Sequence, residues 1–535
     1  MSTRKQVWLG RAARGVSGVA VLGLTAAVVV AGARLPGADA TDVPPTLVSV
    51  PPAASTLVCP GPLILPDDTG RGDSAFDPTP VDPITSVTAV TSVPDGAGSP
   101  GTVSPLDRSA TTGTLDAGGD SAVVTGVTGA QAVRAEPGKA PARVAAASAG
   151  LVTAGDLRGL AAASCQQPVA SAWLLGGATD LTSTAQLVLD NAGSTPAEVT
   201  VALWGPSGPV DLTGERYLVA PGAERVVVLG GIAAEQRRLA VHVSATGGRV
   251  GVHVQDSAID GFTPAGTDLV VPGAAPARRQ VVPGVAVVAS TVDDPAAPAL
   301  RLLVPGDVGT TAHVTLLGPA GVVELPGADA VALAAGEVTD VPLGGLPAGA
   351  YTAVVDADRP VLASAVVTRP GSLGELDDVP SVERAWAAST AVGRSGVLAV
   401  PDGTIGTLVV GAVSQHSDPS TGRDATATVR LLGAGGAILA ERTLRVAAGT
   451  TTAWTVDDLA SGTGDVGAPA TAPAPAGVVG VDLVTDDGAD VDLAWALVAE
   501  VSRPDGVLVS VLDPVQVPRT TPDVAVREDP RLGTR

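Results

Sequence analysis

Aromatic residues, histidine, cysteine and methionine are all scarce in this chain of 535 residues, which contains six Trp, two Tyr, two Phe, four His, two Cys and one Met. Because aromatic side chains are so few, any hydrophobic core must be built from Val, Leu and Ala, which supply most of an apolar fraction of 45%. No His stands near either Cys in the sequence, and this spacing argues against a zinc site.

Motifs typical of enzymes are also missing. The chain has no G-x-S-x-G nucleophile elbow, and no Gly-rich phosphate loop follows an expected strand and opens a helix. Adjacent carboxylates such as Asp293-Asp294 and Asp457-Asp458 stand in expected turns, whereas glycoside hydrolysis needs two carboxylates that face each other across a cleft. We therefore expect no enzymatic activity, no catalytic residue and no bound cofactor.

Acidic residues outnumber basic ones, 54 to 32, so the formal net charge is −22. The first 34 residues carry five basic residues and no acidic one, which leaves −27 for the rest of the chain. Such an acidic body repels phosphate backbones, so nucleic-acid binding is not expected. It also repels an anionic membrane surface, and the N-terminal segment is therefore the one expected membrane contact.

The N-terminus has the pattern of a membrane anchor or an export signal. Residues 1–15 are basic, and residues 16–33 (VSGVAVLGLTAAVVVAGA) form an apolar run without charge. The positive-inside rule puts residues 1–15 in the cytoplasm and the body outside the cytoplasmic membrane, as a single-pass protein. Small-residue sites at 31–33 and 38–40 permit cleavage, so a secreted form stays open as the alternative. The Pro-rich residues 34–56 are expected to be a spacer.

A pattern of alternating strands and turns recurs three times. The copies begin AEVTVALWGPSGPV, AHVTLLGPAGVVEL and ATVRLLGAGGAIL, and each ends in a hairpin-like pair of apolar runs. In the first copy Val199, Val201 and Leu203 share one face, which indicates a half-buried strand. We expect a mainly β fold of tandem antiparallel β-sandwich-like domains, with repeats over residues 171–260, 280–370 and 395–515.

Two segments interrupt or follow these repeats. Within the third repeat, residues 462–477 (GTGDVGAPATAPAPAG) have the composition of a flexible low-complexity insert. Residues 516–535 are charged and contain Pro, and we expect them to form a disordered tail.

The only two cysteines, Cys59 and Cys165, bracket an irregular stretch of weak strands. In an exported chain two thiols predict one disulfide, which makes residues 57–165 a β-rich domain tied at both ends; two free buried thiols are the alternative. The closed loop has about 100 residues, for which chain entropy predicts about 4–5 kcal/mol of stabilisation. The Ala-rich residues 154–163 are expected to contain a short helix.

Among the histidines, His242 and His253 have a suggestive spacing. If Gly247-Gly248 forms a two-residue hairpin turn, the two imidazoles stand opposite each other on one face of the ribbon. Two cross-strand imidazoles can begin a metal site, but no convincing third ligand lies on the same ribbon. We therefore expect an ordinary cross-strand pair and predict no metal site.

Three stretches carry a family pattern: VCPGP at 58–62, GLAAASCQQPVASAWLLGG at 159–177 and LVLDNAGSTPAEVTVAL at 187–203. Together they resemble an uncharacterised family of exported actinobacterial proteins, the domain of unknown function 5719 family (DUF5719). The resemblance implies an N-terminal membrane or signal segment followed by an extracytoplasmic β-rich body. It implies no known activity, so it identifies no functional residue.

These expectations combine into a non-catalytic cell-envelope protein that is tethered to the membrane and acts as a scaffold or interaction module. Its expected partners are envelope proteins or polysaccharide. The alternative is an envelope carbohydrate-binding protein, because sandwich modules often bind glycans; an envelope enzyme is less favoured. Glycan binding usually needs exposed aromatic platforms, whereas core packing is expected for most tryptophans, which stand in apolar strands: Trp173, Trp204, Trp386, Trp454 and Trp495.

Overall fold

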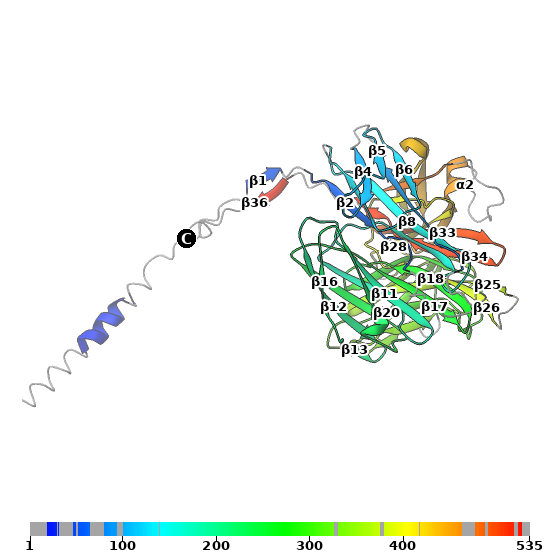
Figure 1. Ribbon diagram of the computed structural model, residues 1–535. Helices are drawn as coiled ribbons and strands as arrows, with labels where there is room; N and C mark the ends of the chain where they lie inside the picture. The colour runs from blue at the N-terminus through cyan, green and yellow to red at the C-terminus, as the bar shows by residue number, and fades with distance from the viewer. Residues whose placement is uncertain are drawn as a thin grey trace, which may run out of the picture. The chain divides into compact units, whose positions relative to one another are not determined.

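The structure of the protein is a computed structural model (Figure 1), and it contains two compact units, Met1–Pro51 with Thr521–Arg535, and Pro52–Thr520. It describes residues 19–28, 30, 46–49, 52–64, 80–93, 100–138, 140–325, 330–374, 379–416, 418–462, 477–486, 490–517 and 523–526. The expected basic segment 1–15 lies outside these residues, as does nearly all of the expected insert 462–477.

In the smaller unit, residues 19–28 form a helix. Within the described part of the chain, no helix is long and apolar enough to cross a membrane, and much of the expected span 16–33 falls outside that part. Strand β1 (Thr46–Ser49) pairs antiparallel with β36 (Asp523–Val526). The expectation of a disordered tail over 516–535 is therefore wrong for β36, because ladder hydrogen bonds to β1 satisfy its backbone.

The larger unit contains four modules of eight or nine strands each. Module 1 comprises β2 (Ser55–Cys59), β3 (Ile84–Thr91), β4 (Gly101–Pro105), β5 (Gly113–Leu115), β6 (Ser121–Thr125), β7 (Gln131–Ala135), β8 (Val144–Val152) and β9 (Gly159–Ser164). Module 2 comprises β10 (Ser171–Leu175), β11 (Ser183–Asp190), β12 (Ala197–Gly205), β13 (Gly208–Val210), β14 (Arg216–Val219), β15 (Glu224–Val228), β16 (Ala240–Thr246), β17 (Gly251–Asp260) and β18 (Thr263–Val270). A single 3-10 turn, η2 (Leu229–Gly231), follows β15.

Module 3 comprises β19 (Ala277–Val287), β20 (Ala299–Leu303), β21 (Thr310–Gly318), β22 (Gly321–Val323), β23 (Val331–Leu333), β24 (Thr339–Pro342), β25 (Gly349–Leu373) and β26 (Pro380–Ala388). Module 4 comprises β27 (Gly396–Ala399), β28 (Ile405–Ser414), β29 (Ala425–Leu432), β30 (Ile438–Val446), β31 (Thr451–Thr455), β32 (Gly480–Thr485), β33 (Val491–Arg503), β34 (Gly506–Leu512) and β35 (Val515–Gln516). It also holds η3 (Ala434–Gly436) and α2 (Val456–Ser461), whose first turn is capped by the Thr455 side chain.

Each module has two antiparallel sheets with the same strand order. The sheet that ends in the last strand of the module, here called the inner sheet, has the orders β6-β3-β8-β9, β15-β11-β17-β18, β24-β20-β25-β26 and β31-β28-β33-β34. The other sheet, the outer sheet, has the orders β2-β7-β4-β5 and β10-β16-β12-β13 in modules 1 and 2. In module 3 the long β25 serves both sheets, because its first half pairs with β19 and β21 and its second half with β20 and β26.

Alternating side chains hold the two sheets of a module together. In module 2 the buried Val199 and Leu203 of the outer sheet belong to one hydrophobic cluster with Leu187 and Leu189 of the inner sheet. The intervening Glu198 is exposed, as the period of two in the sequence predicts. The prediction of a mainly β fold built from antiparallel sheets is thus confirmed.

Module 1 has the same strand order as the other three, although its sequence did not reveal a fourth repeat. The short helix expected within residues 154–163 is wrong, since β9 occupies Gly159–Ser164. Ala favours helices in isolation, but here pairing with β8 and burial on both faces decide the conformation.

The last strands of the four modules form a closed ring. β9 packs along β18, β18 along β26, β26 along β34, and β34 along β9. Glycine permits the close approach at two of these contacts: a Cβ on Gly159 would lie 2.8 Å from the Thr267 carbonyl oxygen, and one on Gly266, where φ is 101°, would lie 2.6 Å from the Arg384 nitrogen. The inner sheets are thus arranged around an axis, as the blades of a β-propeller are.

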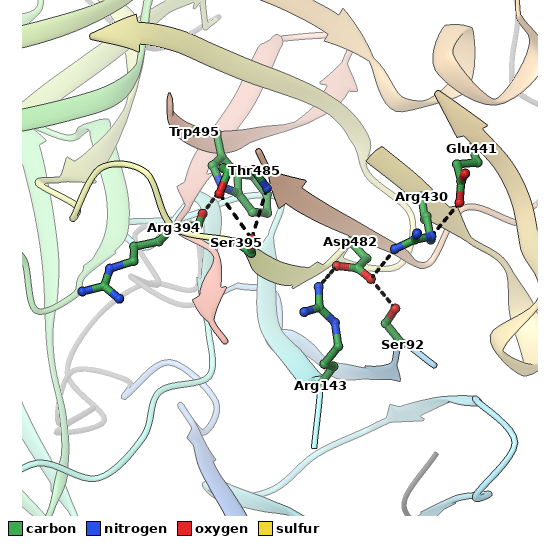
Figure 2. Close-up of polar contacts among 9 residues, drawn as sticks. All are labelled: Ser92, Arg143, Arg394, Ser395, Arg430, Glu441, Asp482, Thr485 and Trp495. Carbon is green, nitrogen blue, oxygen red and sulfur yellow. Dashed lines mark hydrogen bonds and ion pairs between the residues drawn. The ribbon is translucent and has the colours of Figure 1, made fainter. Parts of the chain in front are cut away.

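Modules 1 and 4 close this ring. Figure 1 shows the blue and cyan strands of module 1 beside the orange and red strands of module 4, in agreement with the packing of β8 against β27. A fully buried carboxylate, Asp482, lies at this junction (Figure 2). It accepts hydrogen bonds from Ser92 and Arg143 of module 1 and lies 3.8 Å from Arg430 of its own module. Arg430 continues the network to Glu441 at 2.7 Å.

We predict that Asp482→Ala destabilises the body by about 3–5 kcal/mol, because it leaves two arginines partly buried without their shared carboxylate. Urea unfolding monitored by circular dichroism measures the change. The matched control is Glu441→Gln, which removes a 54% exposed carboxylate from the outer end of the same network and is expected to cost less than about 1 kcal/mol. Equal stability of Asp482→Ala and the wild type would contradict the role of Asp482 in joining module 1 to module 4.

Candidate functional site

The axis of the ring is lined by polar side chains that satisfy the open edges of the last strands. Each of these strands ends its own sheet, so backbone groups on its free edge lack a strand partner. The Leu160 nitrogen donates to Glu383 Oε1 at 3.0 Å, and the Trp386 nitrogen donates to Asp268 Oδ2 at 2.7 Å. Ser510 Oγ accepts from the Ala162 nitrogen at 3.0 Å. Each acceptor therefore belongs to a different module from its donor.

Asp268 is held as a neutral acid in this network. Ser510 Oγ lies 2.8 Å from the Ala162 carbonyl oxygen and 2.6 Å from Asp268 Oδ1, but a hydroxyl has only one hydrogen to donate. A proton on Asp268 removes the conflict, because the carboxyl then donates to Ser510 and Ser510 donates to Ala162. Burial raises the pKa of Asp268 to about 8, which agrees with a proton at neutral pH.

Glu383 is the second buried acid of the axis. Burial raises its pKa well above the usual range, while the hydrogen bond from Leu160 and the nearby charge of Arg158 act in the opposite direction. The Arg158 guanidinium lies 3.8 Å from Glu383 and forms a shorter ion pair, of 2.7 Å, with the more exposed Asp505. The Arg158 charge is therefore shared between the buried Glu383 of the axis and the more exposed Asp505.

A third acid, Asp256, connects β17 to β26. Its Oδ2 accepts from the Trp386 indole nitrogen at 2.9 Å and lies 2.8 Å from the Arg384 guanidinium. Arg301 covers one face of Trp386, and its guanidinium carbon lies 4.8 Å from the ring centroid. These contacts bind modules 2 and 3 together, and the buried acids act as structural partners of backbone and tryptophan.

One end of the ring opens into a pocket of about 420 Å³. It is lined by residues at the carboxyl ends of β9, β18, β26 and β34, so all four strands run in the same direction along the axis. Its polar side chains are Ser164, Gln166, Gln167, Ser389, Thr390, Asp513 and Gln516.

Asp513 is the ionisable group of this pocket. Its Oδ1 atom is buried and has no hydrogen-bond partner among the described residues, and burial raises the pKa of the carboxyl to about 7. Near neutral pH the group can accept or release a proton. Hydrolytic chemistry needs a second group in hydrogen-bond contact, either a nucleophile or an orienting partner, and Asp513 Oδ1 has neither within the described chain.

The disulfide predicted between Cys59 and Cys165 is present. It joins β2 to the residue that follows β9, and Cys165 also lines the pocket. Backbone hydrogen bonds in both directions between Val58 and Gln166 continue the link. The bridge therefore fixes one wall of the pocket to the outer sheet of module 1.

The expected cross-strand pair of His242 and His253 is wrong. β16 and β17 belong to different sheets of module 2, so the chain crosses between sheets at Gly247-Gly248 instead of folding back as a hairpin. His242 is half-buried, and its Nε2 atom shares a hydrogen bond of 3.0 Å with Ser171 Oγ. The imidazole stacks on the Trp173 ring, with 4.3 Å between the ring centroids. His253 is buried on the inner sheet, and burial lowers its pKa to about 4.

In the described part of the chain, no group of three or more His, Cys, Asp or Glu side chains is placed to hold a metal ion. The tryptophans of the described residues divide into two sets. Trp386 and Trp495 are buried, as expected, whereas Trp173, Trp204 and Trp454 are half-buried. Trp173 and Trp204 lie 4.9 Å apart and form, with His242, an aromatic cluster on the outer sheet of module 2.

A family model described as a family of unknown function, DUF5719, matches residues 116–456, more than half of the chain. The chain belongs to the DUF5719 family. Two of the stretches that carry the resemblance, at 159–177 and 187–203, lie within the match. They include β9, β10 and parts of β11 and β12 of this DUF5719 protein. No curated protein and no solved structure matches the chain.

Sequence reasoning missed the buried acids of this DUF5719 protein. A signal was present in part, because Ser510 alone interrupts the apolar strand LVSVL, whereas Asp268 and Glu383 adjoin the polar Thr267 and Arg384 in GTDLV and VERAW. A lone polar residue at an inward position indicates a buried hydrogen bond. The partners come from other modules, however, so only the assembled ring identifies them.

The protonated state of Asp268 predicts a specific pH dependence of stability. Its pKa of about 8 in the folded chain exceeds the value of about 3.9 for an unfolded Asp. Between these values the folded state binds a proton that the unfolded state releases. The free energy of unfolding therefore falls as pH rises, by at most about 1.4 kcal/mol per pH unit, and the loss is complete above about pH 8.

Asp268→Asn is expected to remove this contribution, because its amide donates to Ser510 while its carbonyl accepts from Trp386. Urea unfolding between pH 5 and pH 8 measures the slopes. The variant should lose less stability than the wild type over this range and exceed it at pH 8. Asp268→Ala is the control and should be less stable at every pH, since it leaves the Trp386 nitrogen without an acceptor. If the free energies of unfolding of Asp268→Asn and the wild type change in parallel with pH, Asp268 is not protonated in the folded chain.

Proposed function

We propose that this DUF5719 protein is a non-catalytic protein of the cell envelope, tethered outside the cytoplasmic membrane, whose four-module body acts as an interaction scaffold. The observation that carries the proposal is the use of the buried acids. Asp268 and Glu383 accept hydrogen bonds from strand edges, and Asp256 accepts one from the Trp386 indole. These contacts join the modules, so the buried acids have a structural role that accounts for their presence without a substrate.

The Cys59–Cys165 bond supports an extracytoplasmic place for the body. Structural disulfides persist in oxidising compartments and are rare where thiols are kept reduced. The apolar run at 16–33, preceded by basic residues, also supports export of the body across the membrane.

Shared cores between modules support a rigid scaffold. One hydrophobic cluster combines Val90 and Leu160 of module 1 with the core of module 4, and another combines Val409 and Val509 of module 4 with the core of module 3. A body built in this way presents its surface loops at fixed positions, which suits binding to extended partners.

Carbohydrate binding is the second candidate, and the aromatic cluster of Trp173, Trp204 and His242 favours it. Half-buried aromatic rings offer a face on which a sugar ring can stack. Against this, both tryptophans also pack on Leu303 and Leu362 of module 3, which reduces the aromatic area that a ligand can reach.

The first test concerns the disulfide in living cells. We predict that Cys59 and Cys165 resist a maleimide until the protein is denatured and reduced. Because the bond closes a loop of 106 residues, the Cys59→Ser/Cys165→Ser variant should lose about 4–5 kcal/mol of unfolding free energy. The reduced wild type is the matched control and should behave like the variant. Thiols that react before reduction would place the chain in a reducing compartment and would refute the envelope proposal.

The second test concerns partners. Intact cells are treated with a membrane-impermeant crosslinker, and the full-length chain is then purified under denaturing conditions. Defined envelope proteins in the adducts would support the scaffold, and polysaccharide without protein would support the second candidate. Absence of both would contradict the two proposals together.

A further inference from the structure

An open groove between modules 1 and 2 collects positive charge in an otherwise acidic protein. Its volume is about 980 Å³, and three arginines line it, Arg108, Arg134 and Arg249. The rest of its lining consists of small or uncharged residues, mainly from the segments 53–56, 167–170, 192–195 and 245–248. Among the described residues that line the groove, none is acidic, although the whole chain carries a net charge of −22.

Two of the arginines converge on a single backbone oxygen. Arg134 donates to the Ala192 carbonyl at 2.9 Å and Arg108 donates to the same oxygen at 3.2 Å. Their donating nitrogens therefore lie no more than about 6 Å apart, the sum of the two distances. Burial and the charge of Arg108 lower the pKa of Arg134, as expected for two cations without an anion between them.

Two carboxylates near these residues in the sequence form no hydrogen bond or ion pair with the arginines of the groove within the described chain. Asp107 accepts a hydrogen bond of 2.9 Å from the Ser109 nitrogen. Asp190 is buried opposite Glu224 across two strands, and burial together with the Glu224 charge raises its pKa well above the usual range. No ion pair joins either acid to an arginine of the groove within the described chain.

Arg108 is also held in an uncommon backbone conformation. Its φ of 59° is one of two positive φ values at non-glycine positions in the described residues. Such a conformation is strained and persists only where the surrounding structure enforces it. The Arg108 guanidinium lies beside Arg134 on the same carbonyl oxygen, so a strained residue supplies one of the two neighbouring charges.

We propose that the Arg108–Arg134–Arg249 groove binds an anionic glycan through its carboxylate or phosphate groups. Guanidinium groups match the planar or tetrahedral oxygen array of such anions and bind them with charge-assisted hydrogen bonds. The small Gly, Ser, Thr and Gln residues of the lining suit a hydroxyl-rich chain. No aromatic or large aliphatic residue is among the described residues of the lining, so the groove offers neither a stacking platform for a sugar ring nor an apolar anchor pocket for a protein. Recognition there would rest on the arginine charges and on hydrogen bonds to the hydroxyl groups of the glycan.

Gln167 lines both the groove and the pocket at the end of the ring, so the two hollows are neighbours. The site that we propose for the glycan is the groove itself. This inference rests on the proposed location of the body in the envelope.

Binding is tested with the full-length chain in detergent by isothermal titration calorimetry. The probes are an oligogalacturonate, which bears carboxylates, a phosphomannan, which bears phosphates, and neutral dextran. We expect at least one anionic probe to bind, the neutral probe not to bind, and the affinity to fall as salt rises from 50 to 300 mM. The stronger of the two anionic probes identifies the anion.

Arg108→Gln/Arg249→Gln should weaken binding at least tenfold, because it removes two of the three charges. Both side chains are exposed, so the variant should fold, and its unfolding temperature checks this. Arg445→Gln, an exposed arginine of β30 in module 4, is the matched control and should bind like the wild type.

Three results would overturn the proposal: no anionic probe bound by the wild type, equal binding by the groove variant, or equal loss in Arg445→Gln. Binding of a poly-glutamate peptide, or of anionic lipid vesicles, as tight as that of the glycans would also refute the assignment to a glycan. A failure of the glycan-binding proposal is distinguishable from a failure of the envelope proposal, because the oxidation state of Cys59 and Cys165 in cells is measured independently.

Discussion

Open strand edges at the centre of the larger unit are the constraint on which the rest of its structure depends. β9, β18, β26 and β34 each end an inner sheet, and all four edges are brought together away from water. A buried backbone N–H without an acceptor costs as much as a lost hydrogen bond, so the ring exists only if side chains supply the acceptors. Glu383, Asp268 and Ser510 do so, and each serves a strand of another module.

This exchange makes the four modules interdependent. An acid can be buried at the axis because it gains backbone donors there, and the burial in turn keeps Asp268 protonated. The same reciprocity appears where modules 1 and 4 meet, since Asp482 is buried only because Ser92 and Arg143 arrive from the other end of the chain. A module taken out of the ring would expose an apolar core and leave acids without partners, so the body folds as one unit.

How far the sequence predicted this structure depends on the range of the interaction concerned. Local alternation around Val199 and Leu203 predicted strands and sandwiches, and the presence of two thiols in an expected exported chain predicted the disulfide. The pairing of His242 with His253 failed because a turn at Gly247-Gly248 can either fold back or cross to another sheet, and only packing against β10 and β12 decides. The axis could not be predicted, since its hydrogen bonds join residues 118 to 348 positions apart.

The partners of the arginine side chains distinguish the junctions between modules from the groove that we propose as a binding surface. Arginines at module junctions have carboxylate partners: Arg301 pairs with Asp340, Arg369 with Glu500 and Arg384 with Asp256. Arg108 and Arg134 lie instead on one neutral carbonyl, which cannot neutralise them. In a chain with an excess of acids, two adjacent cations that face a groove without a carboxylate are costly for stability alone. That cost is explained if the groove receives its negative charge from a ligand.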